Sequence, residues 1–207
     1  MLEQRIQQHF IDSADLNYQA AQALGKPIAD AVQAVLACIT SGGKVLCCGD
    51  GASALQAQQF AAFCVAGFER ERPELAALAL SGSAALAAPL PGSTSHHPLS
   101  GSPDAAQPLA RQVRALGQAG DLLLVVSVQG QDAGLLAAVQ AAHERDMTVV
   151  LLGGRSGGAL AALVRETDVL LCVPHDRAAR VREVHGLVLH CLCDGVDAQL
   201  FGEQENP

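Results

Sequence analysis

Five short apolar runs, each followed by a stretch with helical periodicity, constrain the fold of this chain more than any other feature. Because the runs are apolar on both faces, they are typical of a parallel sheet that is covered by helices on both sides. We therefore predict an α/β fold of three layers, with a doubly wound five-stranded parallel sheet in the order 2-1-3-4-5. The predicted strands are Lys44–Cys48, Leu75–Leu80, Leu122–Ser127, Thr148–Leu152 and Val169–Val173.

The segments around these strands predict the helices and a single domain. Two extra helices, Leu2–Leu24 and Pro27–Ile39, precede the first strand and are separated by Gly25-Lys26-Pro27. Within one domain of 207 residues, we assign 1–41 mainly to oligomerisation, 42–201 to the α/β sandwich and 202–207 to a polar tail. Residues 81–104 are rich in Ser, Gly and Pro and predict a long surface loop that carries His96-His97 and a helical turn at 84–88. The later helices are expected at Ser53–Phe68, 105–116, Ala133–Arg145, Gly158–Arg165 and 176–200.

Composition excludes several classes of function. The formal charge of −8 argues against direct binding of nucleic acid, because phosphate contacts need a basic surface. Seven cysteines, mostly in apolar runs and without a Cys-x-x-Cys pair, predict free buried thiols in a reducing compartment. The N-terminus has no apolar leader, and no stretch approaches the length of a membrane span. We therefore expect a cytoplasmic protein without a membrane partner.

Two turns from strand to helix, at 49–53 and 127–132, predict a binding crevice. In a sheet of this order the first and third strands are neighbours, and their carboxyl ends flank the point where ligands bind. Small and hydroxyl residues at such a turn leave backbone N–H groups and the positive end of a helix dipole free for an anion. The candidate crevice residues from these turns are Gly49, Asp50, Gly51, Ser53, Ser127, Gln129, Gly130 and Asp132.

Asp132 introduces a carboxylate where the helix after the second turn begins. At a helix N-cap it would accept the same N–H groups that a phosphate uses. At 4 Å it would also repel a phosphate charge by about 4 kcal/mol at an effective dielectric constant near 20. We expect Asp132 to cap its own helix and to replace the ligand. The alternative is that it points away, while Ser127, Gln129 and Ser53 still hold a phosphate weakly.

Two sets of segments carry a resemblance to known proteins. The first set is 44–53, Phe60-Ala61, 71–73, 120–127, 146–149, Gly157-Gly158 and 180–185, and the second is 112–117, 191–194 and Leu200-Phe201. The first set resembles the sugar isomerase (SIS) family, in the branch of phosphoheptose (sedoheptulose 7-phosphate) isomerase and the DnaA initiator-associating protein DiaA, and the second resembles the DiaA members specifically. The resemblance covers nearly the whole chain and implies the SIS fold.

The resemblance also implies that most of the catalytic groups of the isomerases are missing. The metal-binding His falls on Gln59, the catalytic Glu on Phe63 and a Gln on Arg182, while one His is kept as His190. Phe63 cannot take up a proton, and a guanidinium offers no lone pair to a metal. We therefore expect no metal, no cofactor and no catalytic residue other than His190 as a residual candidate, the alternative for His190 being a packed helix histidine. Arg182 joins the candidate crevice.

From the resemblance we predict a non-catalytic, DiaA-like homotetramer that binds the replication initiator DnaA and promotes its assembly at the origin. Leu200 and Phe201 would form the docking spot, although they could equally close the last helix onto its own core. The alternative functions are a phosphoheptose isomerase, which converts sedoheptulose 7-phosphate to D-glycero-D-manno-heptose 7-phosphate, and a sensor that binds a sugar phosphate without turnover.

Overall fold

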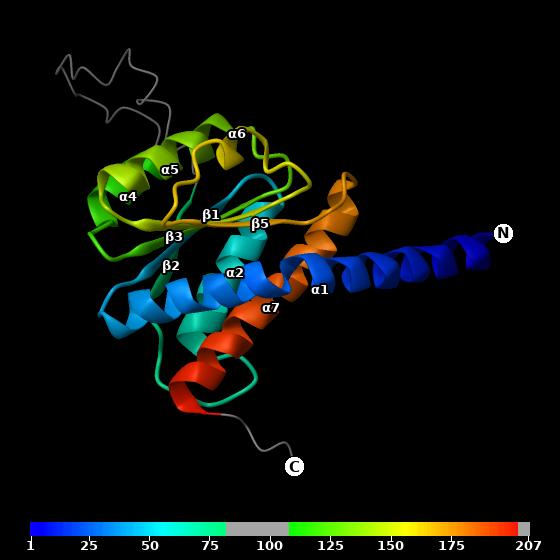
Figure 1. The fold of residues 1–207 in the computed structure, drawn as a ribbon, viewed down its shortest axis with the longest axis horizontal. Helices are drawn as coiled ribbons and strands as arrows, with labels where there is room; N and C mark the ends of the chain where they lie inside the picture. Colours follow the sequence, from blue (N-terminus) through cyan, green and yellow to red (C-terminus); the bar gives the residue numbers. More distant parts are fainter. Residues whose placement is uncertain (82–107, 203–207) are drawn as a thin grey trace, which may run out of the picture.

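A five-stranded parallel sheet in the order β2-β1-β3-β4-β5 forms the centre of the molecule, as predicted (Figure 1). The structure is a computed structural model, and it describes residues 1–81 and 108–202. The register places Val45 of β1 beside Ala77 of β2 and beside Leu122 of β3. The strands are β1 Val45–Gly49, β2 Ala77–Ala79, β3 Leu122–Ser127, β4 Thr148–Gly153 and β5 Val169–Cys172.

Helices cover both faces of the sheet and bury two separate apolar cores. Successive residues of β3 point to opposite faces, so Leu122 and Leu124 join one core while Leu123 and Val125 join the other. The first core lies under α1, α2 and α7, and the second under α4, α5 and α6 (Figure 1). The helices are α1 Leu2–Thr40, α2 Ser53–Ala66, α4 Pro108–Leu116, α5 Ala133–Glu144, α6 Gly158–Ala161 and α7 Ala178–Phe201.

The prediction of two N-terminal helices is wrong, because α1 runs without a break from Leu2 to Thr40 and includes Pro27. A proline inside a helix removes one hydrogen bond and crowds the preceding turn. Here the buried residues continue at helical spacing on both sides of it, from Leu16 and Leu24 to Ala31 and Val35. Packing of this seam against the body of the protein offsets the local cost and keeps the helix continuous.

The unbroken α1 also corrects the expectation that no stretch approaches the length of a membrane span. By length and hydropathy α1 would be long and apolar enough to cross a membrane. Core helices of soluble proteins and signal sequences have the same length and hydropathy, so these properties alone are weak evidence for a membrane span. α1 packs along α7 and contributes Leu16, Leu24 and Val35 to the first core, which accounts for part of its apolar character.

The other predicted elements differ from the structure mainly at their ends. The helix expected over Gly158–Arg165 is a single turn, α6. The expected loop turn at 84–88 and the His96-His97 pair lie outside the described residues, as does most of the polar tail. All seven cysteines are free, and five of them are buried.

A buried ion pair ties the segment after α2 to α7. Arg72 donates from Nε to Asp197 Oδ1 at 2.7 Å, and the side chains of both residues are almost fully buried. The same guanidinium donates to the carbonyl oxygens of Cys64 and Phe63, at 2.7 and 2.9 Å. Burial raises the pKa of the Asp197 carboxyl, while the charge of Arg72 opposes this shift. One side chain thus fixes the end of α2 against α7.

Candidate functional site

A pocket of about 160 Å³ lies where the turns after β1 and β3 meet the first turns of α2 and α7. This pocket is lined by five of the residues predicted for the crevice: Asp50, Gly51, Ser53, Gln129 and Arg182. The other four predicted residues do not line it: Gly49, Ser127, Gly130 and Asp132. The complete lining is Asp50, Gly51, Ala52, Ser53, Val128, Gln129, Ala178 and Arg182.

Gly49 serves the crevice through backbone packing. It ends β1 and lies beside Val126 of β3 in the register. A Cβ at this position would come within 2.6 Å of the Ser53 carbonyl oxygen and 2.8 Å of the Val126 carbonyl oxygen. Only glycine allows the first turn of α2 to approach the sheet this closely.

Ser127 is buried, and its hydroxyl already has two partners. It donates to Asp50 Oδ2 at 3.0 Å and accepts from the Gly130 N–H at 2.9 Å. A hydroxyl has one proton to donate, so donation to an incoming phosphate would require Ser127 to release Asp50. In this structure Ser127 orients the Asp50 carboxylate and supports the turn that carries Gln129.

Asp132 caps α5. Its side chain is exposed, and Oδ1 accepts from the Leu135 N–H at 2.9 Å. Burial, followed by the charges of Asp132 and Asp50, raises the pKa of the Cys48 thiol to about 12, so both carboxylates lie near the end of β1. Because Asp132 does not line the pocket, the geometry resembles the alternative in which it points away from the ligand. Its suggested role as a replacement for a phosphate stays a prediction.

The charges that line the pocket have opposite signs. Arg182 contributes a guanidinium from α7, and its backbone carbonyl accepts from Gln56 Nε2 of α2 at 2.8 Å. The N-terminus of α2 has no side-chain cap, and its Ser53 N–H bonds to the Asp50 carbonyl oxygen at 2.8 Å. The positive helix end and Arg182 would attract an anion, while Asp50 offers a carboxylate for proton transfer.

His190 lies away from this pocket, in an aromatic cluster with Phe63 and Phe68. The centroid of its imidazole lies 5.6 Å from that of Phe63 and 5.3 Å from that of Phe68. The two phenyl rings meet edge to face at 5.1 Å. This arrangement matches the packed helix histidine that the sequence left as an alternative. Gln59 is exposed on α2.

Within residues 1–81 and 108–202, no group of three or more His, Cys, Asp or Glu side chains could hold a metal ion. Arg182 is the polar side chain that α7 places in the crevice, and it cannot ligate a metal. The expected absence of a metal or cofactor stays a prediction.

The end of α7 shows how Leu200 and Phe201 pack in the isolated chain. Leu200 is half-buried and packs against the first core. The guanidinium carbon of Arg70 lies 5.5 Å from the centroid of the Phe201 ring, and Arg70 Nη1 donates to the Gly202 carbonyl oxygen at 2.8 Å. These contacts fit the closing of the last helix onto its own body, while Phe201 keeps 37% of its surface exposed.

Sequence reasoning missed three residues that line the crevice: Ala52, Val128 and Ala178. Ala52 and Val128 sit within the two predicted turns, so the turn positions alone could have indicated them. Ala178 enters because α7 begins at that residue, two residues later than expected. The buried His185 of α7 was also overlooked; its Nε2 lies 3.1 Å from the Gly153 carbonyl oxygen at the end of β4.

A protein-family model described as the SIS domain matches residues 9–154. The chain belongs to the SIS domain family. It is 57% identical over 205 residues to a phosphoheptose isomerase of Methylibium petroleiphilum, a match that covers 99% of this chain and 98% of that protein. The solved phosphoheptose isomerase GmhA from Neisseria gonorrhoeae is 41% identical, with a TM-score of 0.80 and coverage of 96% of this chain and 100% of that one. The phosphoheptose isomerase from Francisella tularensis is 38% identical, with a TM-score of 0.83 and coverage of 95% and 98%.

These relatives correct the functional prediction made from the sequence. The expected DiaA-like scaffold for DnaA is wrong, because full-length relatives at 57%, 45% and 42% identity are named phosphoheptose isomerase. The alternative of an isomerase acting on a sugar phosphate is the one that they favour. The similarity of 112–117, 191–194 and Leu200-Phe201 to DiaA members therefore does not decide the function.

Proposed function

We propose that this protein is a phosphoheptose isomerase that converts sedoheptulose 7-phosphate to D-glycero-D-manno-heptose 7-phosphate in the crevice between β1 and β3. The observation that carries the proposal is the 57% identity, over 99% of the chain, to a protein of that name. The crevice supports it, because a carboxylate and a guanidinium line one pocket at the switch point of the sheet.

Asp50 and Arg182 would divide the chemistry between them. Conversion of a ketose to an aldose requires a base to take a proton from C1 and return it to C2, with negative charge on oxygen between the two steps. Asp50 is the carboxylate among the described residues that line the pocket, and the Ser127 hydroxyl orients it at 3.0 Å. Arg182 would stabilise the enediolate oxygen as charge develops there. The 7-phosphate would lie at the uncapped N-terminus of α2, beside Ser53 and Gln129.

An isomerase assay on matched variants tests this assignment. Formation of the aldose from sedoheptulose 7-phosphate is measured for the wild type, for Asp50→Asn and for Asp30→Asn, a carboxylate on the surface of α1. Because general base catalysis contributes about 10²- to 10⁴-fold, Asp50→Asn should lower kcat at least 100-fold. Asp30→Asn should match the wild type. Full activity in Asp50→Asn would contradict the role of Asp50 as the base.

A second candidate function is binding of a sugar phosphate without turnover. It is favoured by Phe63, which occupies the position that the resemblance gives to the catalytic Glu and packs against His190 at 5.6 Å between ring centroids. Calorimetric titration of the wild type with sedoheptulose 7-phosphate distinguishes the two candidates when it is combined with the assay. Micromolar binding without aldose formation would select this second function, and the absence of both would contradict both.

We further propose that the protein acts in the cytoplasm as a homotetramer that assembles through α1. The N-terminal part of α1 projects beyond the body of the molecule (Figure 1) and exposes Leu2, Ile6 and Phe10. Exposed apolar side chains of this kind are typical of interfaces between subunits.

A further inference from the structure

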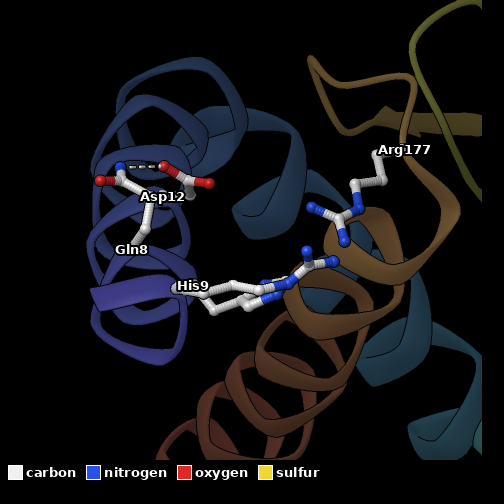
Figure 2. A pocket seen from close by; sticks show the side chains of 5 residues that line it. Gln8, His9, Asp12 and Arg177 are labelled. Carbon is white, nitrogen blue, oxygen red and sulfur yellow. Dashed lines mark hydrogen bonds between the residues drawn. The ribbon is translucent and has the colours of Figure 1, made fainter. Parts of the chain in front are cut away.

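A second pocket, of about 200 Å³, lies outside the crevice, between the N-terminal part of α1 and the start of α7 (Figure 2). It shares no lining residue with the crevice pocket among the described residues. Its lining consists of Arg5, Gln8, His9, Asp12 and Arg177.

Two guanidiniums of this pocket have no acidic partner. Within the described part of the chain, the guanidinium groups of Arg5 and Arg177 form no ion pair and no hydrogen bond, although the backbone N–H of Arg177 donates to His175 Nδ1 at 2.9 Å. Figure 2 shows Arg177 extending from the start of α7 toward α1. Arg177 also occupies the N-cap position of α7, a helix of 24 residues, where the helix dipole is positive. The chain has a formal charge of −8, so two cations without an acidic partner in one pocket indicate a local site for an anion.

The buried Arg180 fixes the orientation of His9, one of the residues that line this pocket. The Arg180 side chain is 6% exposed, its Nη2 lies 2.5 Å from His9 Nδ1, and Nη1 lies 2.5 Å from Glu183 Oε1. Because a guanidinium can only donate, His9 Nδ1 must accept, and the proton of the neutral ring is then on Nε2. His9 therefore keeps a donor for a ligand. The Arg180 Nε is itself buried without a partner, so this region holds more donors than the protein satisfies.

The opposite side of the pocket can accept hydrogen bonds. Gln8 Nε2 donates to Asp12 Oδ1 at 2.7 Å, which fixes the carboxylate and leaves Oδ2 for another donor. Figure 2 shows Gln8 and Asp12 together on α1, across from Arg177. A bare anion would use the cations only, whereas a ligand with hydroxyl groups would use both sides.

We propose that this pocket binds a phosphate monoester that carries hydroxyl groups, as a second site separate from the crevice. Arg5, Arg177 and His9 Nε2 contact the phosphate, and Asp12 accepts from a hydroxyl. Guanidiniums suit this ligand because their paired donors match two phosphate oxygens. A ligand at this position joins α1 to the first turn of α7, which also carries Ala178 of the crevice.

Calorimetric titrations with inorganic phosphate and with glycerol 3-phosphate test the site. All proteins carry Arg182→Gln, which removes the crevice cation. Because the pocket and control variants share this background, any binding of phosphate that remains at the N-terminus of α2 is the same in both, and the comparison does not depend on the proposed isomerase site. Arg5→Gln with Arg177→Gln should weaken the binding of both ligands at least tenfold, because two charge-assisted contacts are lost. The matched control, Lys26→Gln with Arg155→Gln, removes the same charge at exposed positions and should change affinity less than twofold.

The hydroxyl contact has its own test in the same background. Glycerol 3-phosphate should bind more tightly than inorganic phosphate, and Asp12→Ala should abolish that difference without weakening the binding of inorganic phosphate. The proposal is overturned if the pocket and control variants bind phosphate equally, or if neither ligand binds at millimolar concentration. Thermal melts of all variants show whether each protein remains folded.

Discussion

At the scale of single residues, the site depends on how polar groups in the two turns are paired. Ser127 could be recognised from its position in the sequence, but its commitment to Asp50 and the Gly130 N–H could not. That pairing depends on the register between β1 and β3, which brings distant turns together. The capping role of Asp132 was accessible from the sequence, because an acidic residue before a helical pattern has a local partner.

Replacement of Asp132 by Ala measures how much the N-cap of α5 contributes to the free energy of unfolding. The variant removes the acceptor of the Leu135 N–H, and N-cap losses cost about 0.5–2 kcal/mol. Urea denaturation should show Asp132→Ala to be less stable by about that amount. The neighbouring exposed Gln131→Ala should lie within about 0.5 kcal/mol of the wild type. Equal stability of the two variants would show that the cap contributes nothing.

His185 predicts a dependence of stability on pH. Burial, aided by the charge of Arg182, lowers the pKa of His185 from 6.5 to about 4, although the Gly153 carbonyl oxygen opposes the shift. Because the folded pKa lies below the unfolded one, the unfolded chain takes up the proton first as the pH falls. The stabilisation is therefore complete above pH 6.5 and is lost progressively toward pH 4.

The difference between the wild type and His185→Gln isolates this effect. Between pH 7 and pH 4 the wild type should lose about 3 kcal/mol more of its free energy of unfolding than the variant. Urea denaturation at a series of pH values makes the comparison. Parallel losses in both proteins would mean that His185 does not titrate as its burial implies.

At the scale of elements, periodicity predicted the buried strands well and the ends of helices less well. β3 matches its prediction at both ends, because Leu122–Ser127 is wholly buried, begins after the polar Asp121 and ends on a serine. The prediction divided α1 at Pro27, because the destabilising effect of a proline can be recognised from the local sequence. The packing of the buried seam that offsets this effect is a tertiary contact and cannot be recognised in this way. The predicted length of α6 is wrong for a similar reason, because a helical pattern in the sequence does not show where the packing that supports a helix ends.

The ion pair between Arg72 and Asp197 should be the strongest polar contribution to the joining of α2 and α7. Asp197→Ala leaves the guanidinium buried without its partner, and losses of about 3–5 kcal/mol follow such changes. The double variant Arg72→Met with Asp197→Leu removes both charges and should lose less than the single variant. Chemical denaturation of the three proteins decides the matter. A double variant as unstable as Asp197→Ala would contradict the account of an uncompensated charge.

At the scale of the whole molecule, the order of the sheet and the place of the crevice followed from strand–helix alternation and a family resemblance. The function did not follow in the same way, because the choice between a DiaA-like scaffold and an isomerase rested on a few side chains. Phe63 and Gln59 pointed away from catalysis, while relatives matching the full length of the chain are named as isomerases. The pocket between α1 and α7 was invisible in the sequence, since Arg5 and Arg177 lie far apart along the chain.

A proton NMR time course of sedoheptulose 7-phosphate with the wild-type protein in D₂O shows whether the protein moves a proton between C1 and C2. An isomerase that uses Asp50 to move a proton between C1 and C2 should form the aldose 7-phosphate and incorporate deuterium at C2, and the Asp50→Asn protein should do so at least 100 times more slowly. A ketose that remains unchanged and without deuterium, at protein concentrations where it is bound, would contradict the assignment of this protein as an isomerase.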